Sequence, residues 1–207
     1  MREDVKKTIL DFFQKYKLQS YSKGEKIVEP FKHGSSIFCL TEGSVRCFTT
    51  TDHGVELSIN VFRPISFFPL VEILTKLPNR YTYEALTKAK IYQAPQTEVL
   101  SFIKLHPNVS FDLLQRIYIG LDGYLLRIES LLSGEAYHRI LTQLVIQTRR
   151  FGPKIQLTHA DLAALTGLSR ETVTRELGKM KKMGLLESEG RTLIVKNIQL
   201  LEKKLTL

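Results

Sequence analysis

A short segment near the C-terminal end of the sequence combines hydroxyl, cationic and acidic side chains in a spacing suited to reading DNA. It runs Ser-Arg-Glu-Thr-Val-Thr-Arg from Ser169 to Arg175. An arginine presents two donors that match O6 and N7 of guanine, and a glutamate accepts a hydrogen bond from N4 of cytosine. The segment therefore predicts base reading by Arg170, Glu171 and Arg175. Ser169 and Thr172, whose hydroxyl groups suit phosphate, are predicted to contact the DNA backbone.

These side chains are predicted to lie on one face of a helix that begins after Ser169, a candidate N-cap. At about 100° per residue, the polar positions fall on the side opposite the apolar ones. The apolar positions are Val173, Leu177 and Met180, and Gly184 ends the run. The candidate base readers sit at the N-terminal end of this helix, which is the end that meets base edges in DNA-binding helix pairs.

A shorter helix is predicted immediately before it. Thr158, with Asp161 three residues later, is a candidate N-cap, and Leu162 and Leu165 supply an apolar face. Residues 166–168 contain the glycine expected at a tight turn. Two helices joined by such a turn form a helix-turn-helix.

The segment after the two helices predicts a β-hairpin. Apolar residues at 185–186 and 193–195 flank Glu189-Gly190-Arg191, so the hairpin would turn near Gly190 and form the wing of a winged helix. Residues 198–207 are either a last helix or a frayed end. Further candidates for contacts with the DNA backbone are Thr158, His159, Thr174, Lys179 and Arg191.

The segment Ser169–Arg175 closely resembles the recognition helix of the CRP/FNR family of bacterial transcription regulators, whose signature is S-R-E-T-V-x-R. The resemblance implies that Arg170, Glu171 and Arg175 read the bases of a TGTGA-like half-site. It also implies that the protein is a homodimer on double-stranded DNA, with RNA polymerase as a further expected partner.

The distribution of charge agrees with a polyanionic partner for the C-terminal part. The formal net charge is +9, and residues 136–207 hold 13 Lys+Arg against 6 Asp+Glu, whereas residues 1–135 hold 17 against 15. A basic excess of this kind favours nucleic acid. The alternative is a generally basic, solvated surface.

The N-terminal part predicts a helix followed by a β-rich domain. Residues 3–16 place Val5, Ile9, Phe12, Phe13 and Tyr16 on one helical face. From Tyr21 to about Ala94, short β-rich runs alternate with turn residues, as in a sandwich or barrel. Roughly from Ser20 to Pro95 this part resembles the double-stranded β-roll of cyclic-nucleotide-binding domains.

The stretch that corresponds to the family's nucleotide site departs from the pattern for cAMP. Arg80 aligns with the arginine that binds the cyclic phosphate, but the family's Gly and Glu are missing and Phe67-Phe68-Pro69 is bulky. Tyr124-Leu125 stand where cAMP-binding relatives carry Thr-Ser. We therefore expect either another small-molecule effector or none, and not cAMP. The candidate pocket residues are Arg80, Phe67, Phe68, Tyr81, Thr82, Tyr124 and Leu125.

A long helix is predicted from about Asn108 past Leu132. Its apolar residues Leu114, Ile117, Leu121, Tyr124, Ile128 and Leu131 are separated by alternating steps of three and four, a coiled-coil repeat that we call the seam. The family resemblance implies a dimerisation helix; the alternative is a helix that packs on its own β-domain. Gly120 and Gly123 either permit close helix approach or mark a place where the helix changes. Ser133-Gly134 is the candidate hinge.

The predicted fold class is α+β, with a jelly-roll-like β-roll sensor over residues 1–107, a dimerisation helix and hinge over 108–134, and a winged helix-turn-helix over 135–207. Two alternatives remain for function. One is a regulator of the same fold that binds DNA without an effector. The other is a ligand-binding or protein-interaction module whose basic helices contact an acidic partner.

Other function classes find little support. The five histidines fall in separate predicted elements, without metal-ligand or nucleophile-base spacing, so we expect no enzyme, no metal site and no certain cofactor. A hairpin turning at Glu42-Gly43 would place Cys39 and Cys47 on opposite faces of a sheet, which favours buried thiols over a disulfide. No apolar run approaches the roughly 20 residues of a membrane span, and the start MREDVKK lacks the apolar core of a signal peptide, so a cytoplasmic location is expected.

Overall fold

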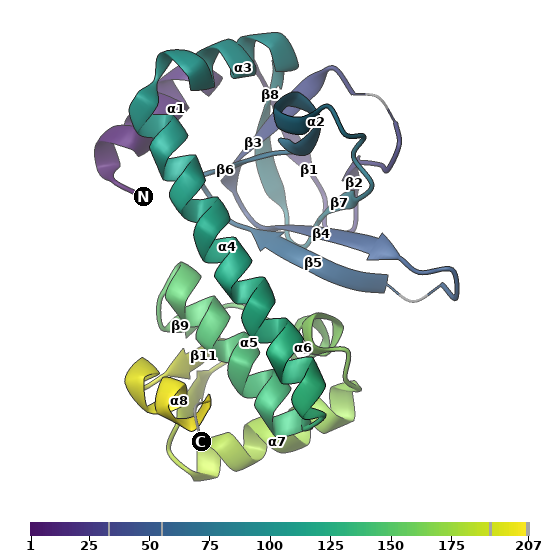
Figure 1. The fold of residues 1–207 in the computed structure, drawn as a ribbon, viewed down its shortest axis with the longest axis vertical. Helices are drawn as coiled ribbons and strands as arrows, with labels where there is room; N and C mark the ends of the chain where they lie inside the picture. Colours follow the sequence, from purple (N-terminus) through teal and green to yellow (C-terminus); the bar gives the residue numbers. More distant parts are fainter. Residues whose placement is uncertain (33, 55, 191, 206–207) are drawn as a thin grey trace. The chain divides into compact units, whose positions relative to one another are not determined.

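The computed structural model describes residues 1–207 apart from residues 33, 55, 191 and 206–207. The chain forms two compact units, residues 1–115 and residues 116–207. One long helix, α4 (Pro107–Ser133), passes from the first unit into the second (Figure 1).

The first unit is built on eight described strands and three helices besides the start of α4. The strands are β1 (Lys17–Tyr21), β2 (Lys26–Val28), β3 (Ser36–Glu42), β4 (Val45–Thr50), β5 (Glu56–Phe62), β6 (Ser66–Phe68), β7 (Thr82–Ala85) and β8 (Ala89–Pro95), and the helices are α1 (Glu3–Phe13), α2 (Val71–Thr75) and α3 (Gln96–Leu105). They form two antiparallel four-stranded sheets, ordered β1-β8-β3-β6 and β2-β7-β4-β5. This is the predicted double-sheet β-roll.

Two core clusters lie on opposite sides of the first sheet, because successive residues of a strand face opposite ways. Cys39 and Phe67 belong to the cluster that packs against α1 and α3. Their neighbours Leu40 and Phe68 belong to a second cluster, which β4 and β7 join from the other sheet. Helix α1 buries Val5, Ile9 and Phe13 in the first cluster, as its sequence pattern predicts.

The hairpin considered at Glu42-Gly43 does not form, although the buried thiols expected for Cys39 and Cys47 are present. The turn itself is present: Gly43 has a φ of +89°, and a Cβ atom there would lie 2.3 Å from the carbonyl oxygen of Lys88. However, β3 pairs with β8 and β6, whereas β4 pairs with β5 and β7. The turn thus carries the chain from one sheet to the other, and Cys39 and Cys47 lie buried as free thiols in separate clusters.

The second unit contains the rest of α4 followed by a winged helix-turn-helix. Its elements are α5 (Ala136–Phe151), β9 (Lys154–Ile155), α6 (His159–Thr166), α7 (Arg170–Lys182), β10 (Leu186–Glu189), β11 (Thr192–Val195) and α8 (Ile198–Leu205). Helix α5 contacts α6, α7, α8 and β9, and the strands form an antiparallel sheet ordered β10-β11-β9. The predicted hairpin is confirmed. For the C-terminal segment, where a helix and a frayed end were both considered, residues 198–205 form helix α8. With this unit and the β-roll, the predicted α+β fold class is confirmed.

Helix α4 keeps its seam side chains in contact with solvent in the single chain. Their exposed fractions run from 38% for Tyr124 to 60% for Leu114. Gly123 faces α5 in the second unit, where a Cβ atom would lie 3.4 Å from Cγ2 of Ile146, at the limit of ordinary van der Waals contact. A Cβ atom on Gly120 would meet nothing within 4 Å. None of the helices among the described residues is long and apolar enough to cross a membrane.

Candidate nucleic-acid interface

Helix α6 begins at a complete capping box. The Thr158 hydroxyl accepts a hydrogen bond from the Asp161 backbone N–H at 3.1 Å, and Oδ2 of Asp161 accepts one from the Thr158 backbone N–H at 2.8 Å. These two bonds satisfy donors that a helix start otherwise leaves unpaired. Gly167 ends the helix with a φ of +66°. The predicted start and end of this helix are therefore both present, and they fix its position before α7.

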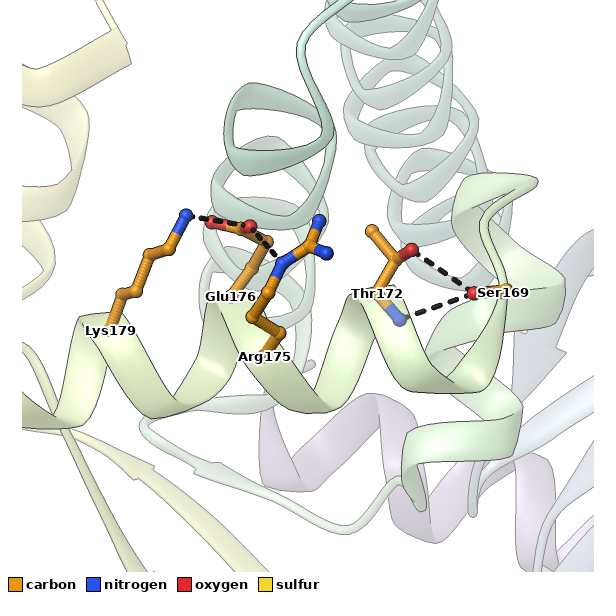
Figure 2. A network of polar contacts seen from close by, with 5 residues as sticks. All are labelled: Ser169, Thr172, Arg175, Glu176 and Lys179. Carbon is orange, nitrogen blue, oxygen red and sulfur yellow. Dashed lines mark hydrogen bonds and ion pairs between the residues drawn. The ribbon is translucent and has the colours of Figure 1, made fainter.

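Helix α7 begins one turn later at the predicted N-cap Ser169. Its side-chain oxygen accepts a hydrogen bond from the Thr172 backbone N–H at 3.2 Å and donates to the Thr172 hydroxyl at 3.0 Å (Figure 2). The cap uses hydroxyl groups that were predicted to contact phosphate. Ser169 is still exposed and Thr172 half-buried.

The two faces of α7 divide as the helical periodicity predicts. Val173, Leu177 and Met180 are fully buried. The candidate base readers Arg170, Glu171 and Arg175 are all exposed, as is Thr174. The structure thus brings the three candidate readers together on one solvent-facing side of a helix whose other side is fixed by the core.

Glu171 carries a carboxylate suited to accept hydrogen bonds. A hydrogen bond from its own backbone N–H is the main cause that lowers its pKa, and the nearby Ser169 hydroxyl and the charge of Arg170 act in the same direction. The group is therefore anionic at neutral pH, as hydrogen bonding to cytosine N4 requires.

A chain of hydrogen bonds joins the starts of α6 and α7. The Thr174 hydroxyl donates to the carbonyl oxygen of Arg170 at 2.8 Å and lies 2.8 Å from Nδ1 of His159. Because a hydroxyl has only one hydrogen, Nδ1 of His159 must be the donor in the second bond. Burial lowers the pKa of His159, and the charges of Lys181 and Arg170 lower it further.

Glu176 is a member of this surface that the sequence analysis missed. It lies on the edge of the buried face, and its carboxylate accepts from Nε of Arg175 at 3.1 Å and from Nζ of Lys179 at 2.9 Å (Figure 2). Residues three apart are neighbours on a helix surface, so its position three residues after the apolar Val173 could have indicated from the sequence that it is buried. Lys179, a predicted backbone contact, is exposed and is held by this carboxylate.

The wing hairpin pairs Glu189 with Thr192, and Gly190 follows β10 with a φ of +57°. Arg191, a predicted phosphate contact, lies outside the described residues. Thr158, at the start of α6, is exposed.

The candidate effector-pocket residues are spread over several environments. Phe67 packs on Phe13, with 5.5 Å between ring centroids, whereas Phe68 stacks on Tyr83 between the two sheets at 4.9 Å. Thr82 is buried on β7, Tyr81 is half-buried beside the second cluster, and Arg80 is exposed. Tyr124 and Leu125 belong to the part of α4 in the second unit.

Two polar residues that organise the β-roll were not identified from the sequence. Asn79 is buried and donates from Nδ2 to the Tyr81 carbonyl oxygen at 2.7 Å, which shapes the loop that carries Arg80. Arg46 forms ion pairs with Glu56 at 2.8 Å and Glu84 at 3.3 Å across three strands. Both have roles within the fold: Asn79 is held by a partner two residues away, whereas Arg46 is paired with Glu84 on a strand far along the chain.

Histidine, cysteine and carboxylate side chains do not gather into a metal site anywhere among the residues that the structure describes. His33 lies outside them.

Comparison with known proteins agrees with both halves of this architecture. A family model of the cyclic nucleotide-binding domain matches residues 18–106, and one of the Crp-like helix-turn-helix domain matches residues 131–204. The chain is 27% identical to the cyclic AMP receptor protein of Thermus thermophilus over 94% of this chain and 89% of that protein. It is 24% identical to the global nitrogen regulator of a Synechocystis strain over 91% of this chain and 88% of that protein.

Solved structures share the fold. A CooA variant from Carboxydothermus hydrogenoformans matches with a TM-score of 0.76 at 21% identity, over 95% of this chain and 93% of that one. FixK2 from Bradyrhizobium japonicum matches with a TM-score of 0.73 at 22% identity, over 91% of this chain and 96% of that one. The solved structures show the shared fold, whereas the two family models, together with the curated relatives, show that the chain belongs to the CRP/FNR family of transcription regulators.

Proposed function

We propose that this protein is a homodimeric, sequence-specific DNA-binding regulator that reads a TGTGA-like palindrome. Arg170, Glu171 and Arg175 would read bases. The predicted phosphate contacts would position the domain on the duplex: Ser169, Thr172, Thr174, Thr158, His159, Lys179 and Arg191. Specific binding in the cytoplasm would then block or recruit RNA polymerase.

The observation that carries this proposal is the exposed face at the start of α7. Two arginines and a glutamate stand there on a helix whose opposite face is buried, so the protein's own fold leaves these three side chains available to a partner. Arginine and glutamate are the side chains whose hydrogen-bonding groups match guanine and cytosine in the major groove.

The seam of α4 supports the homodimer. Six apolar side chains at coiled-coil spacing are 38–60% exposed in the single chain, and a second copy of the helix would bury them. A two-fold dimer would present two α7 helices to half-sites about 34 Å apart, one turn of DNA. We propose residues 1–107 as the sensor, 108–134 as the dimer helix and hinge, and 135–207 as the DNA-binding domain.

The β-roll interior supports a sensor that does not use cAMP. The rings of Phe62, Phe68 and Tyr83 pack against one another there, with centroids 4.9–5.8 Å apart. A second candidate function follows from the same observation. Aromatic side chains that fill the roll would suit a regulator that binds DNA without any effector.

Fluorescence anisotropy tests the proposal. The purified protein is titrated into a labelled TGTGA-N6-TCACA duplex and into a scrambled duplex, at about 150 mM salt, with and without cAMP. We expect the palindrome to bind at least about a thousandfold more tightly than the scrambled duplex, with no change on addition of cAMP.

Other outcomes separate the alternatives. Tight binding only with cAMP would contradict the proposed sensor. Tight binding that no tested small molecule changes would favour the regulator without an effector. An Arg170→Ala variant should lose about 1–3 kcal/mol of specific binding free energy and discriminate less at one base pair. If it kept full affinity for the palindrome, a module that contacts an acidic protein partner would become the better explanation.

A further inference from the structure

The polar network on α7 is centred on a buried carboxylate. The side chain of Glu176 is 5% exposed, whereas those of Arg175 and Lys179 are 65% and 58% exposed. One atom, Oε1 of Glu176, accepts from Nε of Arg175 at 3.1 Å and from Nζ of Lys179 at 2.9 Å. Figure 2 shows the two cationic side chains on either side of the carboxylate. A buried charge needs partners of this kind, because desolvation alone would neutralise it.

Glu176 occupies the boundary between the two faces of the helix. At about 100° per residue, it lies roughly 60° from buried Val173 and roughly 60° from exposed Lys179. The carboxylate is therefore itself buried, but it lies beside the base-reading face and can bond to side chains on that face. The hydrogen bond from Lys179 and, to a smaller extent, the one from Arg175 keep the pKa of Glu176 below its usual range. The group therefore stays charged at neutral pH.

The contact to Nε decides which edge of Arg175 is left for DNA. An arginine can meet a guanine with two of its N–H groups, and these come from Nε and the two Nη atoms. With Nε held by Glu176, the two Nη atoms point away from the carboxylate, as Figure 2 shows, and remain free of this contact. A long side chain that is otherwise 65% exposed is thus restricted before DNA arrives, which lowers the entropy lost on binding.

The contact to Lys179 acts on a different component of binding. Lysine side chains attract phosphates of any sequence, and this attraction makes up most non-specific affinity. The negative charge of Glu176 lies 2.9 Å from this ammonium group and offsets part of its attraction.

Building on the DNA-binding function proposed above, we propose that Glu176 is a positioning residue that sets base specificity. It presents the Nη edge of Arg175 to a guanine and restrains the phosphate attraction of Lys179. Loss of Glu176 should therefore weaken binding to the palindrome relative to binding to unrelated DNA, through both effects at once.

Two substitutions test this role. Glu176→Gln keeps the shape and removes the charge, and Glu176→Leu removes the acceptor while suiting the buried position. Each is titrated by anisotropy with the TGTGA-N6-TCACA duplex, its single base-pair variants and a scrambled duplex, over a range of salt concentrations. We expect the ratio of palindrome to scrambled affinity to fall about tenfold, and the salt dependence on scrambled DNA to steepen by up to about one counterion.

A double-mutant cycle separates positioning from a general structural effect. In an Arg175→Ala background, substitution of Glu176 should no longer change discrimination between base pairs, because the group it positions is gone. Glu129→Gln, the same charge change at an exposed site on α4, is the matched control and should leave the affinity ratio unchanged. Circular dichroism melting reports whether each variant is folded.

The outcomes distinguish this inference from the function on which it rests. If the wild-type protein binds all duplexes alike, the proposed function fails and the inference fails with it. If the wild type discriminates and the folded Glu176 variants discriminate equally well, only the inference is overturned. The inference would also be overturned if substitution of Glu176 reduced discrimination between base pairs equally in the wild-type and Arg175→Ala backgrounds.

Discussion

At the scale of single residues, the proposed interface consists of side chains that also stabilise the protein's own helices. The Thr174 hydroxyl is bonded to Arg170 and His159, and the Ser169 hydroxyl is bonded to Thr172. Such bonds fix the start of α7 before any ligand is present. Side chains that are already ordered lose less freedom on binding than free ones do.

His159 should make folding stability depend on pH. Its pKa in the folded protein is lowered, by burial first and then by Lys181 and Arg170, so the unfolded chain takes up the proton at a higher pH. The contribution of His159 to the free energy of unfolding is therefore full above the ordinary histidine pKa of about 6.5, and it is lost as the pH falls below that value. We expect urea unfolding midpoints to fall less in His159→Gln than in wild type between about pH 7.5 and about pH 5.5. Parallel curves would contradict this assignment.

The capping box of α6 should contribute measurably to stability. Thr158→Ala removes the acceptor for the Asp161 backbone N–H and should lower the free energy of unfolding by about 1 kcal/mol. Thr158→Ser keeps the hydroxyl and is the control. Urea unfolding followed by circular dichroism measures both, and equal losses in the two variants would show that the hydroxyl does not act as a cap.

At the scale of elements, the sequence predicts well what depends on neighbours in the chain. The seam helix, the two capped helices and the wing were all indicated by local spacing, and each is present. The turn at Gly43 was indicated too, but its pairing was not. Whether β3 continues into a hairpin with β4 or crosses to another sheet depends on β8 and β7, which lie about forty residues further along.

The candidate site shows the same limit. The exposure of Arg170 and Arg175 follows from helical period alone. The separation of Phe67 from Phe68 follows from strand alternation, but which of the two faces the roll interior depends on α1 and the second sheet. Glu176 was overlooked although it lies three residues after buried Val173, because a glutamate at such a spacing is usually solvated. Only the packing of α7 on the rest of the unit, including α5, decides whether that position is covered.

Replacing Gly178 by alanine tests whether α7 could be more stable than it is. Gly178 lies inside α7, where a glycine costs about 1 kcal/mol relative to alanine, yet an added Cβ atom would meet nothing within 4 Å. Gly178→Ala should therefore raise the free energy of unfolding by about 0.5–1 kcal/mol, measured by urea unfolding. A destabilised variant would show that the backbone here needs glycine for another reason. The anisotropy assay on the same variant shows whether DNA approaches this part of the helix.

At the scale of the whole molecule, the basic excess and the exposed seam favour one arrangement. The excess of lysine and arginine is confined largely to residues 136–207, which favours contact with a polyanion at that end. The seam runs along the helix that leads into this part. A dimer formed through the seam would place two such basic parts on one duplex, so that each half-site contact strengthens the other.

Disrupting the seam should therefore affect assembly and DNA binding together. Leu121 lies in the middle of the seam and is 51% exposed in the single chain. Leu121→Glu would place a charge in each of two facing helices at the dimer interface, where like charges and desolvation both oppose association. We expect light scattering after size-exclusion chromatography to give the mass of one chain for the variant and of two for the wild type.

A matched control locates the effect in the seam. Leu77 lies outside α4 and is 61% exposed, so Leu77→Glu makes the same substitution away from the seam. This variant should keep the molecular mass of a dimer. The monomeric Leu121→Glu variant should also bind a palindrome no better than a single half-site, because its two DNA-binding parts are no longer joined. If instead Leu121→Glu stays dimeric while folded, the seam is not the dimer interface, and the two chains associate through another surface.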